Sequence, residues 1–284
     1  MKKQKSNLPE SSVLYLVPTT IGNIDDMTNR AVEVLKKVDY IFAEDTRVTK
    51  VLLSHFNIIT PLHSYHVFNE KMQTDKIIEL LQQGKQIALV SDAGLPGISD
   101  PGYFATRRVL DSGFSVIALP GANAALTALV ASGLPSNRFY FFGFLSHKKN
   151  LKKKELEKIA DLEDTIIFYE APHRLLETLE LIHLVLGNRE IVIARELTKK
   201  HEEYIRGKVK DIIAGIDELK GEIVIIVKGA EISQAQQLLN KKSISEHYQY
   251  YLDLGNESMK AIKQVAKDRG VAKNFIYKEI HKNI

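Results

Sequence analysis

Four stretches of this 284-residue chain place glycine, proline, threonine and carboxylate residues directly after apolar runs. They are PTTIGNIDD from Pro18, EDTRVTK from Glu44, SDAGLPGISDPG from Ser91 and PGANAALTAL from Pro120. Glycine lets a backbone approach a ligand without interference from a Cβ atom, and it leaves N–H groups exposed as donors. Glycine and proline also form ordinary turns. Four such loops nevertheless favour a ligand-binding site.

The residues and motifs that several other common binding sites and active sites require are missing from this sequence. The chain has no cysteine, which excludes a disulfide scaffold, a zinc–thiolate site, an iron–sulfur cluster and a cysteine nucleophile. The patterns GxxxxGK(S/T), HExxH and GxSxG do not occur, and GxGxxG does not follow the first apolar run. His63 and His66 flank Tyr65 without a third ligand at metal spacing, so no metal site is predicted.

The apolar runs before these loops are typical of buried strands in a parallel sheet. Strands are predicted at Val13–Val17, Tyr40–Ala43, Ile87–Val90 and Val116–Leu119, and helices over Asp25–Lys37, up to Leu53, up to Leu81 and over Tyr103–Leu110. Ligands of parallel sheets bind beyond the carboxyl ends of the strands, where the four loops fall. We therefore expect an α/β domain over residues 13–120, preceded by an N-terminal extension of residues 1–12.

The same alternation restarts near residue 120. Strands are predicted at Phe139–Phe144, Thr165–Tyr169, Ile191–Ala194 and Glu222–Val227, and helices at Ala122–Ala131, Leu151–Ile159, Arg174–Leu186 and Val209–Ile213. This pattern predicts a second α/β domain over residues 121–229. A helical tail over 230–284 would follow, in which Glu257–Lys267 and Lys273–His281 flank a turn like a helix-turn-helix, a shape that any helical hairpin shares.

The net charge of +4 is mild, but the cations cluster. Lysines crowd the stretch from Lys148 to Lys158, and residues 231–284 hold 9 Lys/Arg against 6 Asp/Glu. Such clusters suit a polyanionic ligand, although a solvated helix face is the favoured explanation for any single run of lysines. No apolar run approaches the roughly 18 residues of a membrane span, and no signal-peptide segment follows the basic start, so a cytoplasmic protein is predicted.

The ordered motifs carry a family resemblance. They are LYLVPTTIGN, AEDTRVTKVLL, SYHVFNE, VSDAGLPGISDPG, PGANAALTAL, ASGLPSNRFYFFGFL, IFYEAPHR, ARELTKKHEE and KGEIVIIV, between Val13 and Gly229. Together they resemble the class III, or tetrapyrrole methylase-like, methyltransferases. Within these they are similar to the RsmI type, which 2′-O-methylates the ribose of a cytidine in the decoding region of 16S ribosomal RNA. Thr20, Val48, Leu95 and Ala171 depart from the residues common in that family.

The resemblance implies two consecutive α/β domains with S-adenosylmethionine bound in a cleft between them, usually in a homodimer. The implied cofactor-binding residues are Pro18, Ser91, Asp92, Ala93, Gly94, Pro96, Gly97, Gly121, Ala122, Tyr169, Ala194, Arg195 and Glu196. The implied partner is 16S rRNA or the small ribosomal subunit. Its candidate contacts are Arg47, His173, Arg174, Arg195, Lys199 and Lys200, while Tyr65 and Phe68 either stack on a base or belong to the core.

Methyl transfer requires the attacking ribose oxygen to be aligned with the methyl carbon and relieved of its proton. Glu44, Asp45 and Asp100 are predicted at strand ends, and any of them could accept that proton. Lys199 and Arg195 could instead polarise the oxygen or hold a phosphate. Each of these side chains could also be a helix cap or an RNA contact, and the sequence does not choose among them.

Two other functions stay open at this point. One is a class III methylase that acts on a tetrapyrrole or another small acceptor, which would not need the basic surface. The other is a non-catalytic nucleic-acid-binding regulator that works through its helical tail, which would leave the four loops unexplained.

Overall fold

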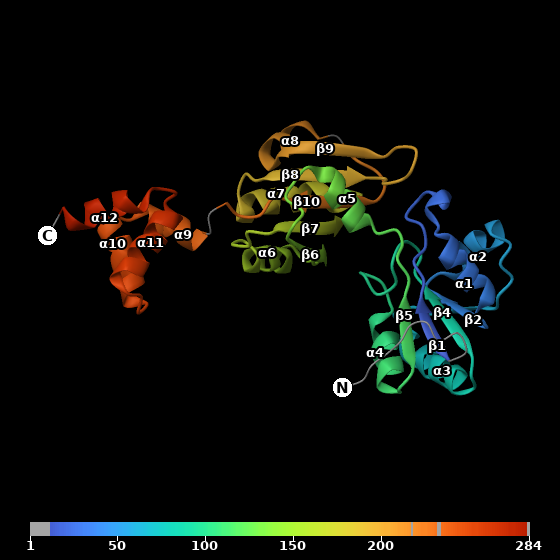
Figure 1. Ribbon diagram of the computed structural model, residues 1–284. Coiled ribbons are helices and arrows are strands. Elements are labelled where there is room, and N and C mark those ends of the chain that lie inside the picture. The colour runs from blue at the N-terminus through green and yellow to red at the C-terminus, as the bar shows by residue number, and fades with distance from the viewer. Residues whose placement is uncertain (1–11, 217, 232–233, 283–284) are drawn as a thin grey trace. The chain divides into compact units, whose positions relative to one another are not determined.

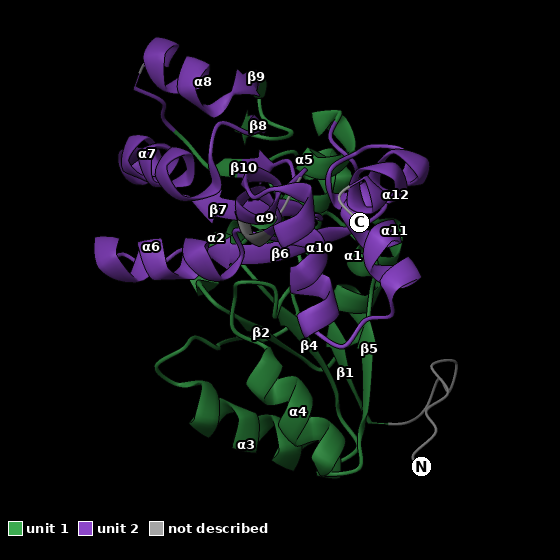
Figure 2. Cartoon of the chain, turned by 90° about the vertical axis from the view of Figure 1, so that its left-hand side faces the viewer, with its two compact units in different colours: residues 1–133, 193–204, 221–224 green, residues 134–192, 205–220, 225–284 purple. Residues whose placement is uncertain are grey.

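The computed structural model describes residues 12–216, 218–231 and 234–282. The chain divides into two compact units (Figure 2). Unit 1 contains residues 1–133, 193–204 and 221–224, and unit 2 contains residues 134–192, 205–220 and 225–284. Residues 1–11 of the predicted N-terminal extension lie outside the described residues. The domain boundaries at 120 and 229 stay a prediction.

The first sheet consists of five short strands (Figure 1). They are β1 (Val13–Leu16), β2 (Tyr40–Ala43), β3 (Leu62–Ser64), β4 (Gln86–Val90) and β5 (Ser115–Ala118), in the order β3-β2-β4-β1-β5. Every neighbouring pair is parallel. All five carboxyl ends therefore lie at one edge of the sheet, as the sequence predicts for its loops.

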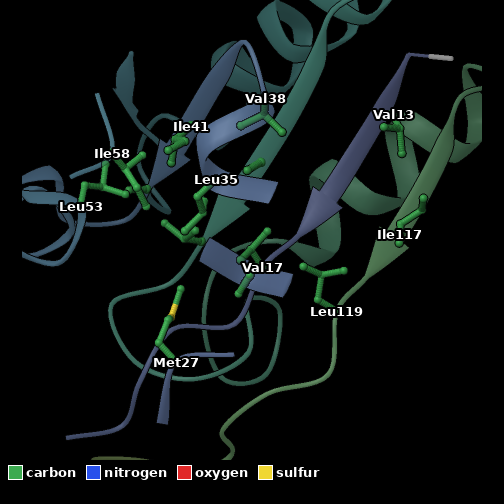
Figure 3. Close-up of a cluster of buried hydrophobic side chains, with 14 residues drawn as sticks. Val13, Val17, Met27, Leu35, Val38, Ile41, Leu53, Ile58, Ile117 and Leu119 are labelled. Carbon is green, nitrogen blue, oxygen red and sulfur yellow. The ribbon is translucent and has the colours of Figure 1, made fainter. Parts of the chain in front are cut away.

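Helices cover both faces of this sheet because its strands are apolar on both sides. α1 (Asn29–Lys37) and α2 (Thr46–His55) pack over a cluster that includes Val13, Ile41 and Val90 (Figure 3). α3 (Glu70–Gln82) and α4 (Tyr103–Asp111) pack over the opposite face, with Leu14, Phe42 and Leu89. Neighbouring residues of each strand thus serve opposite cores, which is the period-two pattern of a strand buried on both faces.

In this unit one local prediction is wrong and one strand was not predicted. The helix predicted from Asp25 begins at Asn29, because the Thr28 side chain accepts the Ala31 N–H and caps it there. Residues Ile24–Asp26 form a separate 3₁₀ turn. The strand β3 was not predicted, since it has only three residues and all of them are half-buried.

The second sheet also has five strands. They are β6 (Phe139–Phe144), β7 (Thr165–Glu170), β8 (Glu190–Arg195), β9 (Glu203–Lys208) and β10 (Ile223–Val227), in the order β6-β7-β10-β8-β9. The helices of this part are α5 (Ala124–Ser132), α6 (Lys149–Lys158), α7 (Leu175–Leu186) and α8 (Val209–Gly215). β9 was not predicted, because it is an edge strand without a fully buried residue.

The described part of the tail contains four helices rather than the predicted pair. They are α9 (Gln234–Lys241), α10 (Ile244–Asp253), α11 (Ser258–Asp268) and α12 (Lys273–His281). Ile262, Ile276 and Ile280 pack together in the core of the tail, whereas Met259 is 46% exposed and does not join them. Buried Asp268 accepts hydrogen bonds from Tyr251 Oη and Gln264 and lies 3.2 Å from His247 Nε2. These contacts connect α11 to α10, because a buried carboxylate must find polar partners.

The basic stretch on α6 is not a uniform solvated face. The Lys152 side chain is fully buried, and its Nζ donates to Thr178 Oγ1 at 2.8 Å and to Glu177 Oε1 at 3.1 Å. The carboxylate of Glu170, also fully buried, lies 3.8 Å from the same nitrogen. The prediction that Lys152 belongs to an outward cation cluster is therefore wrong. The lysine instead compensates a buried carboxylate at the end of β7.

We predict that Lys152→Met lowers the free energy of unfolding by about 3 kcal/mol, because it leaves Glu170 buried without its ammonium partner. Lys153→Met is the matched control, since the Lys153 side chain is 48% exposed. Urea denaturation followed by circular dichroism measures both variants. Equal stability of the two would show that the buried pair does not hold α6 against β7.

Candidate functional site

Three loops of unit 1 meet at the carboxyl edge of the first sheet. The Thr19 N–H donates to Gly94 O at 2.9 Å, and Thr19 Oγ1 donates to Ser91 O at 3.1 Å. A Cβ added to Gly121 would lie 2.3 Å from the Pro18 ring. The loops after β1, β4 and β5 therefore contact one another at the level of the backbone. Pro18, Ser91, Gly94, Gly121 and Ala122 are brought together as predicted for one site.

The loop after β4 needs its glycines. Gly94 and Gly97 have φ values of +77° and +84°, which side chains rarely adopt. A Cβ on Gly94 would also lie 3.3 Å from Ala122 O and from Ile21 Cγ2. The Ser91 hydroxyl donates to Gly94 O at 3.0 Å and fixes the turn. Ala93 is exposed and Pro96 is buried, so only part of this loop is open to a ligand.

Three carboxylates influence one another beside this loop. Burial, together with the negative charges of Glu44 and Asp92, raises the pKa of Asp100 to about 7. Burial and Asp92 also raise the pKa of Glu44, while His66 opposes this shift. A carboxyl group with a pKa near neutrality can both accept and release a proton at physiological pH. Asp100 is thus the candidate base best tuned for proton transfer.

Asp45 has a different role from its two neighbours. Its side chain accepts the Arg47 N–H at 2.8 Å and caps the amino end of α2. The Arg47 guanidinium lies 2.6 Å from Asp45 Oδ2, and these bonds lower the pKa of Asp45 to about 2. A carboxylate so firmly ionised is a weak base. The Arg47 side chain is 90% exposed and stays accessible to an anion.

A cavity of about 350 Å³ opens within unit 1 at the same edge of the sheet. Four apolar side chains and five polar ones line it: Ile24, Val48, Val51, Leu52, Thr19, Thr20, Thr49, Ser91 and Asp92. Its volume lies in the range of about 300–1,000 Å³ that is common for small-molecule pockets. Thr19 and Thr49 were not predicted as lining residues, because a threonine after a strand or within a helix carries no distinctive sequence signal.

The loop between β8 and β9 is strained and held by ion pairs. Glu196 and Thr198 have φ values of +50° and +65°, which is rare for a residue with a Cβ and most unusual for threonine. Lys199 Nζ lies 2.9 Å from Glu196 Oε1 and 3.1 Å from Glu222 Oε2. The Thr198 hydroxyl accepts the Asn23 N–H at 2.9 Å, which connects this loop to the one after β1. Strain of this kind gathers at functional sites.

The other predicted site residues differ in burial and in their contacts. Ala194 is buried within β8, and Arg195 Nε lies 2.6 Å from Glu203 Oε2. The Arg174 guanidinium is mostly buried and donates to Leu145 O and Ser146 O, so in unit 2 it supports a neighbouring loop. His173 and Lys200 are exposed, while Tyr169 is half-buried and packs edge-on against Phe141. Their roles in cofactor or RNA binding stay predictions.

The two aromatic candidates separate clearly. Tyr65 is buried, and its hydroxyl lies 3.2 Å from Thr74 Oγ1, so Tyr65 belongs to the core. Phe68 is 97% exposed and remains available for stacking.

Across the residues that the structure describes, no helix is long and apolar enough for a membrane span. The described side chains also contain no group of three or more His, Cys, Asp or Glu residues suited to a metal ion.

Comparison with known proteins places the chain in a family. The family model "Tetrapyrrole (Corrin/Porphyrin) Methylases" matches residues 13–213. The chain belongs to the tetrapyrrole methylase family. Two relatives from this family, both called "Ribosomal RNA small subunit methyltransferase I", come from Bacillus subtilis (strain 168) and Halalkalibacterium halodurans. The first is 50% identical over 96% of this chain and 95% of its own, and the second is 47% identical over 99% of each.

Solved structures of other tetrapyrrole methylase-like proteins share the fold. "Crystal structure of diphthine synthase" matches with a TM-score of 0.60 and 14% identity, over 77% of this chain and 90% of that one. "Crystal structure of the methyltransferase CobJ" matches with a TM-score of 0.59 and 20% identity, over 78% and 95%. The predicted fold class, with two α/β sheets and a helical tail, is thereby confirmed.

S-adenosylmethionine is the methyl donor of the tetrapyrrole methylase family, which confirms the predicted cofactor. The loops of unit 1 fit such a group, because Gly121 leaves an exposed peptide group without a side chain where the loops meet, and buried Gly94 lets the β4 loop approach Ala122 closely. In the same β4 loop, Ala93 is exposed and Gly97 is half-buried.

We predict that Gly94→Val weakens S-adenosylmethionine binding by at least about tenfold, because the new Cβ presses on Ala122 O in a backbone conformation that valine resists. Gly84→Val is the matched control: Gly84 has a φ of +85°, but no atom lies within 4 Å of the added Cβ. Isothermal titration calorimetry measures the affinity of each. Equal binding by the two variants would separate this loop from the cofactor.

Proposed function

We propose that this chain transfers a methyl group from S-adenosylmethionine to the ribose 2′-oxygen of a cytidine in 16S ribosomal RNA. The observation that carries the proposal is the 50% identity, over nearly the whole chain, to a ribosomal RNA small subunit methyltransferase. That likeness disfavours a tetrapyrrole acceptor and a non-catalytic regulator. The proposal also places the protein in the cytoplasm, where small subunits are assembled.

The cofactor supplies an electrophilic methyl group on a sulfonium centre. Alignment of the ribose hydroxyl and removal of its proton are then the tasks of the protein. Asp100 is the proposed proton acceptor, since Asp45 is held ionised by Arg47 and Lys199 is engaged by two carboxylates. Arg47 and Lys200 are the exposed cations proposed to hold RNA phosphates.

Mapping of 2′-O-methylation tests the proposed reaction directly. The purified protein is incubated with S-adenosylmethionine and either free 16S rRNA or small subunits from cells that lack it. Methylation of one cytidine ribose supports the proposal and identifies which of the two is the acceptor. Methylation of a base, or of no RNA, would contradict it.

We predict that the rate rises as the pH increases through about 7 and then levels off, because Asp100 must lose its proton to act as a base. Asp100→Asn should reduce the rate by about 10²-fold or more and abolish this inflection. The measurement is single-turnover methylation between pH 5.5 and 9. Asp111→Asn is the control, since Asp111 is an exposed partner of Arg107. An inflection that survives in Asp100→Asn would assign the base elsewhere.

The helical tail is proposed to dock RNA rather than to take part in methyl transfer. Lys260, Lys263 and Lys267 are exposed along α11, while the apolar residues of that helix face the tail's own core. Phe275 and Tyr277 on α12 are each nearly half exposed, and exposed aromatic rings beside cations suit single-stranded RNA. The exposed lysines would therefore attract RNA phosphates, while the apolar residues hold the tail together.

We predict that changing Lys260, Lys263 and Lys267 together to Gln weakens RNA binding and leaves S-adenosylmethionine affinity within about twofold. The slope of log K against log salt should flatten by roughly 0.7–0.9 for each phosphate that the variant no longer neutralises. Filter binding across a salt series measures the slope, and calorimetry measures the cofactor. A drop in cofactor affinity in the folded variant would place the tail in the active site.

A homodimer is proposed from the resemblance and from one surface. β6 is an edge strand of the second sheet, and its Phe139, Tyr140 and Phe144 are each 41–53% exposed. An exposed aromatic edge of this kind is typical of a surface that a partner covers.

A further inference from the structure

The cavity of unit 1 has the composition of a nucleobase pocket. Its apolar walls come from the 3₁₀ turn and α2, through Ile24, Val48, Val51 and Leu52. Its polar groups come from strand ends and from Thr49. A pyrimidine or purine is flat and apolar on its faces and polar only along its edge. A volume of about 350 Å³ accommodates one such ring.

One buried hydroxyl, on a residue that lines this cavity, lacks a partner. Thr49 is 2% exposed, and its Oγ1 makes no hydrogen bond to any residue that the structure describes. Thr19 and Ser91, by contrast, donate to backbone carbonyls beside them. A buried hydroxyl left unsatisfied costs about 1–3 kcal/mol. Buried polar groups are rarely left so, and Thr49 therefore indicates a ligand that supplies the missing partner.

An oriented carboxylate faces the same cavity. Asp92 Oδ1 accepts the Asp45 N–H at 2.9 Å, which fixes the carboxylate relative to the start of α2. No described residue hydrogen-bonds Asp92 Oδ2, and the Asp92 side chain lines the cavity and is exposed. A carboxylate is an acceptor only, so its natural ligand partner is an N–H donor.

We infer that this cavity receives the base of the acceptor nucleotide. Asp92 accepts from an exocyclic amine, and the Thr49 side chain turns about χ1 to bring its buried hydroxyl into the cavity and donate to the adjacent ring nitrogen. Cytosine presents this pair as its 4-amino group and N3, whereas uracil presents an oxygen and an N–H in the reverse order. The site therefore selects cytidine over uridine. The inference rests on the proposed function and names the residues that choose its base.

This assignment changes the role of Asp92. The family resemblance predicts it as a cofactor contact, whereas the cavity directs its side chain to the acceptor. Flipping a base into a separate pocket would also draw the attached ribose to the strand ends, where Asp100 lies. Base recognition and proton removal would then depend on adjacent loops of one unit.

The test compares small subunits that carry cytidine or uridine at the methylated position. The proteins are the wild type, Asp92→Asn, Thr49→Val and the control Asp75→Asn, whose carboxylate is exposed on α3 and pairs with Arg108. We expect the wild type and Asp75→Asn to prefer cytidine. Asp92→Asn should reduce the ratio of kcat/KM for cytidine over uridine at least about fivefold, because its amide can donate to the uracil oxygen.

Thr49→Val keeps the shape of the side chain and removes only the hydroxyl. It should lower kcat/KM for cytidine at least about fivefold and leave S-adenosylmethionine affinity unchanged. If the wild type is active and Asp92→Asn keeps the same preference for cytidine over uridine, the inference is overturned while the proposed function stands. Loss of S-adenosylmethionine binding in folded Asp92→Asn or Thr49→Val also overturns it, since the cavity would then belong to the cofactor. A wild type that methylates neither substrate overturns the proposed function as well.

Discussion

The candidate site depends on how closely three loops approach one another at the edge of the first sheet. The Pro18 ring occupies the space where a side chain on Gly121 would begin, and Gly94 lies against the carbonyl of Ala122. The Gly121 contact is possible only without a Cβ atom, because real Cβ atoms essentially never approach other heavy atoms within 3.0 Å. At Gly94 an added Cβ would lie 3.3 Å from Ala122 O, and the φ of +77° is one that side chains rarely adopt. The glycines are therefore required for the packing of the protein itself, before any ligand is bound. Because the loops pack so closely, Asp100 and Glu44 are partly withdrawn from water near Asp92, which raises the pKa of both.

Most of the framework of this site is predictable from the sequence because its signals are local. Apolar runs such as Tyr40–Ala43 and Phe139–Phe144 mark strands with the bounds that the structure shows. The elements that were missed lack such a signal. β9 is an edge strand with no fully buried residue, and β3 takes its place in the sheet through pairing with β2. Tertiary pairing, rather than a pattern within the segment, makes these residues strands.

The side chains of the site were less predictable, because the sequence shows a charge without its partner. Lys152 belongs to a run of lysines but is the one that turns inward to Glu170. Arg174 stands in a strand-end motif, yet its guanidinium supports the backbone at Leu145 and Ser146. Glu44 and Asp45 are adjacent carboxylates in the sequence, and only the folded structure shows that Asp45 caps α2 and pairs with Arg47. The spacing of charged residues therefore points to the region of the candidate site. Only the contacts in the folded chain show which charged side chains are engaged in structural ion pairs and which are candidates for chemistry.

The ion pairs around Lys199 explain why that lysine is better suited to holding a loop than to activating an oxygen. Glu196 and Thr198 adopt left-handed backbone conformations, which cost free energy unless the surroundings enforce them. Lys199 joins the carboxylates of Glu196 and Glu222, and the Glu196 carboxylate also accepts the Glu222 N–H. A lysine released to polarise a substrate oxygen would have to leave both carboxylates and free the strained turn. The same ammonium cannot serve both tasks at once. Asp100 forms no ion pair with the described residues, so it is free to change its protonation state without dismantling the loop that surrounds it.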